Sequence, residues 1–297
     1  MTRVWKAFTF LWWEVKSMSN LLSAELHRMF RHRYYWIGTI LFGCIPYLSM
    51  YLIRQADIRH NNPKPEPPDG ILFAGTFYLP ILIAVFVCLH IGSEYSDKTI
   101  RNKIALGHSR TMVYLVNWIV CNAGVFLTYF IYVVVSFIGG YFLTNGYLTS
   151  FSAMCGDLFI SFMITMVYTT LMQMFVMLVQ SKSAGAVISL VFAIFIMLAG
   201  ASVMQKLNEP EYMTADILVT YNGDVNDQHQ PNPAYVSGKE RETLMVVADI
   251  LPSSQSMQLA EGAFAPEKLM RMPVYSCVVI LLSLAVGISL FRREDMK

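Results

Sequence analysis

Residues 71–91 read ILFAGTFYLPILIAVFVCLHI, a run in which no Asp, Glu, Lys or Arg occurs. A helix crosses the hydrocarbon core of a bilayer in roughly 20 predominantly apolar residues. Apolar runs of about 10–14 residues are more typical of a buried helix in a soluble protein. This stretch therefore predicts a transmembrane helix.

The remainder of the chain repeats the pattern. Five further apolar runs are Trp36–Ile53, Met112–Leu143, Cys155–Val179, Ala184–Met204 and Met272–Phe291. The run Met112–Leu143 is longer than a bilayer requires, so we expect it to tilt, to project or to break. The adjacent Gly139 and Gly140 mark the expected break. We predict an all-α membrane protein with six transmembrane helices.

Composition supports a membrane protein and argues against other classes. Of the 297 residues, 55% are hydrophobic and 14% are charged, whereas soluble domains have about 25% charged residues. The net charge of +2 is too small to indicate a nucleic-acid surface. The five cysteines lie in or beside apolar runs and form no CxxC or Cys/His spacing, so we interpret them as packing residues and predict no metal site.

The basic residues predict the orientation. Most of the 22 lysines and arginines lie on the cytoplasmic side if both termini are cytoplasmic. No cleavage site precedes the first run, so that run is predicted to be an uncleaved signal anchor. The expected organisation is a cytoplasmic segment at residues 1–35, five spans in 36–204, an extracellular loop at 205–271, and a sixth span with a cytoplasmic tail at 272–297.

Two external loops follow from this topology. Residues 61–68 are Pro-rich and resist regular structure, and residues 221–227 are acidic and turn-rich. The second half of the longer loop predicts two short helices, Glu240–Leu251 and Ser253–Gly262, on either side of Pro252. These helices either cap the outer mouth of the bundle or form a passive linker.

The segment at residues 20–33 predicts an amphipathic helix before the first span. Leu22, Leu26, Met29 and Phe30 share one face. The other side carries charged and polar residues, namely Glu25, His27, Arg28, Arg31 and His32. Such a helix lies in the membrane interface with its basic side toward anionic headgroups. The alternative is a basic flank that only sets the topology.

The cytoplasmic loop at residues 92–110 predicts a second short helix. Ser96 is placed to cap a helix over 96–107, which Gly107 ends, and Ser109 is placed to cap the next span. Ile100 and Ile104 lie one turn apart and share a face. A capped helix between two spans can transmit motion from a cytoplasmic partner, whereas the alternative is a passive loop.

These residues resemble a known family. Gly92-Ser-Glu94-Tyr, Lys98-Thr-Ile-Arg101 and Gly107-His-Ser-Arg110 are similar to the cytoplasmic motif of type-2 ABC transporter permeases, as are Glu25–Phe30 and Phe291–Asp295. The resemblance covers residues 18–297, although the loop at 205–271 exceeds the minimal family plan. It implies an interfacial connecting helix before span one and an ATPase-coupling helix after span two. The implied coupling residues are Asp97, Lys98, Ile100, Arg101, Lys103 and Ile104, with Glu94 near the gate.

The resemblance also implies partners. The chain has no GxxxxGK[ST] phosphate loop, so we expect ATP and Mg²⁺ to bind to a separate ABC ATPase subunit and expect no enzymatic activity or cofactor in this chain. A second permease subunit, identical or paralogous, is implied as well. Family members mostly export drugs, antimicrobial peptides or lipid-like substrates, and the implied location is a bacterial plasma membrane.

The fourth predicted span contains a polar ridge. Its members recur every four residues and are Asp157, Ser161, Thr165, Thr169 and Gln173. Polar groups in lipid normally face protein or water, so the ridge predicts a translocation path or a subunit interface. Ordinary hydrogen bonds between helices are the alternative.

Three other function classes are alternatives to the permease. An ion-coupled carrier or channel is disfavoured because no ionisable residue lies in the deep middle of a span. An intramembrane enzyme is disfavoured because no HExxH or GxSxG motif occurs. A non-transporting sensor or scaffold that uses residues 205–271 stays open.

Overall fold

The structure is a computed structural model that describes residues 2–60, 68–144, 147, 149–212, 231–262 and 266–294. Most of the Pro-rich stretch at 61–68 and all of the turn-rich stretch at 221–227 lie outside these residues. Within the described ranges the regular structure is helical, and no strand forms beyond an isolated bridge between Tyr212 and Pro231. The prediction of an all-α fold is confirmed.

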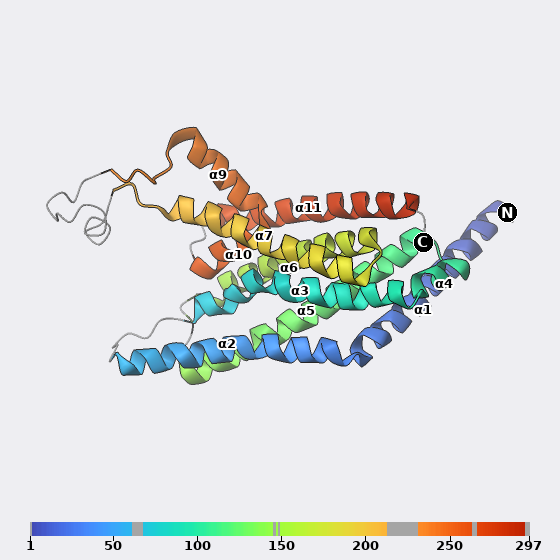
Figure 1. Ribbon diagram of the computed structural model, residues 1–297, viewed down its shortest axis with the longest axis horizontal. Helices are drawn as coiled ribbons and strands as arrows, with labels where there is room; N and C mark the ends of the chain where they lie inside the picture. Colours follow the sequence, from blue (N-terminus) through green and yellow to red (C-terminus); the bar gives the residue numbers. More distant parts are fainter. Residues whose placement is uncertain are drawn as a thin grey trace.

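Six long helices run alongside one another (Figure 1). They are α2 (Arg33–Arg59), α3 (Asp69–Ser96), α5 (Arg110–Leu143), α6 (Phe151–Val179), α7 (Lys182–Asn208) and α11 (Pro266–Arg293). Each contains a stretch long and apolar enough to cross a bilayer, and each includes one of the predicted apolar runs. The six predicted spans are therefore confirmed.

The bundle has an interior helix and a rim. Helix α3 packs against α6, α7 and α5, so much of its circumference is buried. The rim helices α2, α7 and α11 expose large apolar side chains such as Leu41, Phe195 and Leu281. An apolar rim of this kind is stable where the surrounding solvent is lipid. All five cysteines are free, and only Cys88 and Cys121 are buried, so the packing role predicted for all five applies to these two.

The expected break at Gly139 and Gly140 is wrong, because α5 is continuous from Arg110 to Leu143. Both glycines are buried at close contacts instead. A Cβ atom at Gly139 would lie 2.8 Å from Met50 Sδ, and one at Gly140 would lie 2.5 Å from the Tyr147 hydroxyl. Small residues at these positions let neighbouring segments approach the helix closely.

One end of the bundle carries both labelled chain termini and the helices α1 and α4, which overlap the two segments predicted to be helical outside the spans (Figure 1). Helix α1 (Thr2–Arg31) is longer than the predicted segment, and His32 separates it from α2. Helix α4 (Thr99–Ala105) is shorter than the predicted range 96–107, because α3 continues through Ser96. We refer to this end of the molecule as the α4 end.

The opposite end carries α9 (Gly238–Ile250) and α10 (Pro252–Glu261), so the two helices predicted around Pro252 are present. Helix α10 packs against α3, α6 and α7. Its buried Ser253 hydroxyl donates a hydrogen bond of 2.6 Å to the carbonyl of Ile196 on α7. The helix is thus built into the bundle, which a passive linker would not be.

The contact between α3 and α5 leads to a stability prediction. A Cβ atom at Gly75 would lie 2.6 Å from the ring of Tyr132, which is buried and cannot move aside freely. Overpacking of this kind costs about 1–3 kcal/mol, so Gly75→Ala is expected to lower the thermal unfolding temperature of the purified protein. Gly38→Ala is the matched control, since its Cβ would lie 3.8 Å from Leu82 Cδ1. Equal unfolding temperatures for the two variants would contradict the prediction.

Candidate functional site

Helix α4 is held by defined turns at both ends. Lys98 has a positive φ of 58° and redirects the chain from α3 into α4, and the Thr99 hydroxyl donates to the carbonyl of Glu94. Gly107 has a φ of +96° and follows the last turn, as expected of a helix-ending glycine. The Ser109 hydroxyl accepts a hydrogen bond from the Met112 amide, which confirms it as the cap of α5. Ser96 is not a cap, because its hydroxyl donates to the carbonyl of Gly92 within α3.

One face of α4 packs onto the protein itself. Ile100 is 1% exposed and belongs to the hydrophobic core, and Ile104 packs against that core with part of its surface exposed. The prediction that these two residues share a face is confirmed. Their apolar contact anchors α4 to this chain.

Beneath α4 lies a buried charge cluster, which we define as Glu25, Arg28, His90, Glu94, Lys103 and Asn117. Glu94 is 0% exposed and occupies its centre. The Lys103 ammonium lies 2.8 Å from Glu94 Oε2, and Asn117 Nδ2 donates to the same oxygen at 3.3 Å. Arg28 forms an ion pair with the other oxygen, Oε1. A single carboxylate thus joins α1, α3, α4 and α5.

A second buried carboxylate, Glu25, completes the cluster. Lys103 Nζ lies 2.6 Å from Glu25 Oε1, and Arg28 Nη2 lies 2.7 Å from Glu25 Oε2. Burial raises the pKa of Glu25, but attraction to Lys103 and Arg28 outweighs it and holds the pKa below its ordinary value of 4.5. Glu25 is therefore ionised at neutral pH. The expectation that it lies on the polar outer side of α1 is wrong, since it faces the core beside Leu21 and Met29.

The charges in the cluster balance. Two carboxylates face two permanent cations, and each carboxylate contacts both Lys103 and Arg28. Removing one partner from a buried ion pair leaves an uncompensated charge and costs about 3–5 kcal/mol. Moving one of these helices away from the others would break the pairs and is therefore unfavourable. Helices α1, α3, α4 and the start of α5 are thus joined so that displacement of one is transmitted to the others.

The same cluster does not suit a metal ion. Ligand atoms of Glu25, His90 and Glu94 lie within 4.8 Å of one another, the arrangement in which a cation could bind. The oxygens that would ligate a metal are already paired with Lys103 and Arg28. A divalent ion would have to displace both cations or share the site with them against their repulsion. The side chains favour a fixed ion-pair network.

The face of the α4 segment that lies away from Ile100 and the charge cluster is exposed on the surface of the protein. Its exposed residues are Asp97, Lys98, Arg101, Asn102, Ala105 and Leu106. Leu106 is 80% exposed although it is a large apolar residue, and it lies just past the last turn of α4. A large apolar side chain exposed at the end of a short, mostly polar segment is available for contact with another protein. We call these six residues the α4 surface.

The C-terminal end of α11 meets the start of α5 at the same end of the bundle. The Arg110 guanidinium donates to the carbonyls of Arg292, at 3.1 Å, and Glu294. The last carbonyls of a helix lack partners within the helix, so a cation there both satisfies and stabilises them. Arg110, which ends one segment of the family resemblance, and residues 291–294, which belong to another, are therefore neighbours in space.

A comparison of the sequence with protein-family models supports the resemblance to transporter permeases. The family model described as "ABC-2 family transporter protein" matches residues 21–200, which is more than half of the chain. The chain belongs to the ABC-2 transporter family. It is thus a multi-pass membrane protein and the permease subunit of an ABC transporter. No curated protein sequence matches it.

The match begins within α1 and extends into α7, so it covers the whole charge cluster and the α4 surface of this ABC-2 permease. Sequence analysis identified Glu94 and Lys103 but missed their partners Glu25 and Arg28. One signal was available: Leu21, Glu25 and Met29 follow each other at four-residue spacing, which places a carboxylate on the apolar side of a helix. Asn102 and Leu106 of the α4 surface were also missed.

The polar ridge of the fourth span lies mainly inside the permease. Ser161, Thr165, Thr169 and Gln173 are buried, and Asp157 is half-buried. The three hydroxyls donate to carbonyls of their own helix, and Gln173 Nε2 donates to the Tyr114 carbonyl on α5 at 3.0 Å. Of these four hydrogen bonds, the Gln173 bond joins two helices, as the alternative interpretation expects, and the other three lie within α6.

The ridge leads to a second prediction. Thr165→Val/Thr169→Val removes two hydroxyls that bond only to α6 and keeps the side-chain shape. We expect both the unfolding temperature and the transport rate to change little. Transport is measured with the complete transporter in vesicles, with Gln173→Leu as the comparison, since that change breaks a contact between helices. A large transport defect in the threonine variant with normal folding would place the ridge on the substrate path.

Proposed function

We propose that this ABC-2 permease is the membrane subunit of an ATP-driven exporter and that a separate ABC ATPase binds the α4 surface. The observation that carries the proposal is the two-sided construction of α4. Its inner side is joined to α1, α3 and α5 by Ile100 and the charge cluster, and its outer side is exposed. A partner that moves α4 therefore moves helices that cross the membrane.

The proposed topology follows from the same end of the bundle. If the ATPase is cytoplasmic, then α1, α4 and both chain termini face the cytoplasm, and α9 and α10 lie on the outer side (Figure 1). Helix α1 would then lie at the inner membrane surface. The orientation agrees with the excess of basic residues at the α4 end.

The rest of the assembly is proposed from the family. A complete transporter contains two permease subunits, identical or paralogous, and two ATPase subunits that bind ATP and Mg²⁺. Transport is outward, and the substrate class is a drug, an antimicrobial peptide or a lipid-like molecule. The location is the plasma membrane of a bacterium.

An ion-coupled carrier is the main rival. Such a protein would use a buried carboxylate to bind the transported cation or proton. Among the described residues the two buried carboxylates, Glu25 and Glu94, are already paired with two basic side chains, so they offer no uncompensated charge to a transported ion. The charge cluster therefore favours mechanical coupling over ion binding.

The direct test is co-expression with a candidate ABC ATPase from the same organism, followed by purification on a tag carried by the permease. We expect the ATPase to co-purify and its hydrolysis rate in vesicles to depend on the permease. The same vesicles should accumulate substrate only when ATP is supplied on the ATPase side. Transport by the permease alone, driven by an ion gradient, would contradict the proposal.

A further inference from the structure

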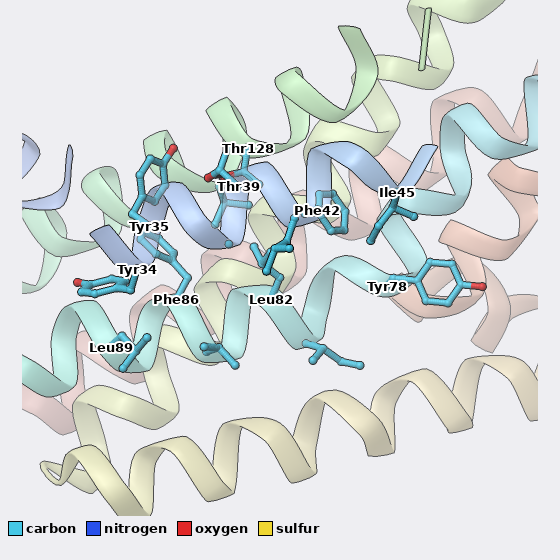
Figure 2. Close-up of a pocket in the computed structure, with 15 residues that line it drawn as sticks. Tyr34, Tyr35, Thr39, Phe42, Ile45, Tyr78, Leu82, Phe86, Leu89 and Thr128 are labelled. Atoms are coloured by element: carbon cyan, nitrogen blue, oxygen red, sulfur yellow. Dashed lines mark hydrogen bonds between the residues drawn. The ribbon is translucent and has the colours of Figure 1, made fainter. Parts of the chain in front are cut away.

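A groove on the membrane-facing side of the bundle has no role in the coupling described above. It lies between α2 and α3, with part of α5 as its floor, and has a volume of about 370 Å³. Figure 2 shows the side chains that line it, including Tyr34, Phe42, Ile45, Tyr78, Leu82 and Leu89. We propose that this groove binds an acyl chain of an anionic phospholipid and that basic residues at its α4 end bind the headgroup.

The lining of the groove suits a hydrocarbon chain. Apart from the tyrosine hydroxyls, its only side-chain polar groups are the hydroxyls of Thr39 and Thr128, which hydrogen-bond to each other at 2.8 Å. The Thr128 hydroxyl also donates to the carbonyl of Gly124. A polar ligand would find few free partners here, whereas an acyl chain needs none.

The length of the groove matches one leaflet. Along α2 its lining extends from Tyr34 to Ile45, which at 1.5 Å per residue is about 16 Å. Half of the hydrocarbon core of a bilayer is about 15 Å thick. The exposed residues Leu41, Tyr78 and Val85 belong to the lining and form its open side. A lipid can therefore enter sideways from the leaflet at the α4 end.

The α4 end of the groove lies at headgroup level. Trp36 is exposed at this end, and its indole N–H donates a hydrogen bond to the carbonyl of Phe30. Tyr34, the first lining residue of α2, comes directly after Arg33 in the sequence. Tryptophan and tyrosine concentrate at the membrane–water interface. Arg31 and Arg33 are exposed, and the first turn of α2 contains no acidic residue. Arginine forms bidentate contacts with phosphate, so this end favours an anionic phospholipid.

Two substitutions test the two parts of the site. Gly38→Leu adds a side chain inside the groove without a backbone clash, since a Cβ atom there would lie 3.8 Å from Leu82 Cδ1. Arg33→Gln removes one headgroup contact. The matched controls are Ile37→Phe, which enlarges an exposed residue of α2 outside the lining, and Arg293→Gln, which removes an exposed arginine at the end of α11.

The measurement is photo-crosslinking in vesicles of phosphatidylcholine and phosphatidylglycerol. The probe is phosphatidylglycerol with a diazirine in one acyl chain, and labelled peptides are identified by mass spectrometry. We expect labelling to concentrate on residues 34–45 and 78–89. Gly38→Leu should reduce this labelling about tenfold, and Arg33→Gln should reduce it about fivefold. The two controls should leave it unchanged.

Several outcomes would overturn the inference. Equal labelling of α2, α7 and α11 would mean ordinary boundary lipid, and equal labelling by a phosphatidylcholine probe would remove the anionic preference. Crosslinks to a second copy of the chain, with a changed oligomeric state in Gly38→Leu, would make the groove a subunit interface.

If Gly38→Leu does not fold, Leu82→Trp fills the groove from the opposite wall and has the same expected result. The test needs no ATPase, so its result is independent of the proposed function.

Discussion

Glu94→Gln is expected to reduce ATP-driven transport between about 5-fold and 150-fold, the range that corresponds to typical coupling free energies. Glutamine keeps the size of the side chain but leaves Lys103 and Arg28 facing a single carboxylate, Glu25. The buried excess of positive charge should also lower stability by about 3–5 kcal/mol. Transport in vesicles and thermal unfolding of the purified complex measure the two effects separately.

A double variant separates coupling from stability. In Glu94→Gln/Lys103→Met the remaining charged residues of the cluster are Glu25 and Arg28, which balance and lie 2.7 Å apart. We expect stability to recover toward that of the unmodified protein, while transport stays low because α4 has lost its ion pairs to α3 and α1. Recovery of transport together with stability would show that the cluster only stabilises the fold.

Leu106→Asp is expected to abolish stable association with the ATPase and leave the permease itself intact. Leu106 is 80% exposed and lies at the edge of the α4 surface. Interface anchors typically contribute at least 2 kcal/mol to binding, which corresponds to a loss in affinity of about 30-fold or more. Co-purification and a binding titration in detergent measure the association, and thermal unfolding measures the permease alone.

Ile100→Asp is the informative comparison for that variant. Ile100 is buried against this chain, so an aspartate there would be an unpaired charge in the core. We expect it to lower the unfolding temperature and to weaken ATPase binding only because α4 detaches. Arg101→Ala, on the exposed side, is expected to weaken binding without affecting stability. If Leu106→Asp binds the ATPase normally, the α4 surface is not the docking site.

The membrane fold follows from the distribution of apolar residues along the chain. Runs such as 71–91 are apolar over a length that only a bilayer accommodates, and this property depends on composition along the chain, not on distant contacts. Local signals also sufficed for Gly107 as the glycine that follows the last turn of α4, for the cap at Ser109 and for the helices around Pro252. Each of these features involves residues within a few positions of one another.

The pairing of the charged residues depends on how the helices pack against one another, which the sequence does not show. Glu25 and Lys103 are far apart in sequence, and nothing local indicates that they meet at 2.6 Å beneath α4. The same limit explains the error at Gly139, where close helix packing replaced the expected break. Helix periodicity shows which residues share a face, but the element that covers that face depends on how the helices pack against each other.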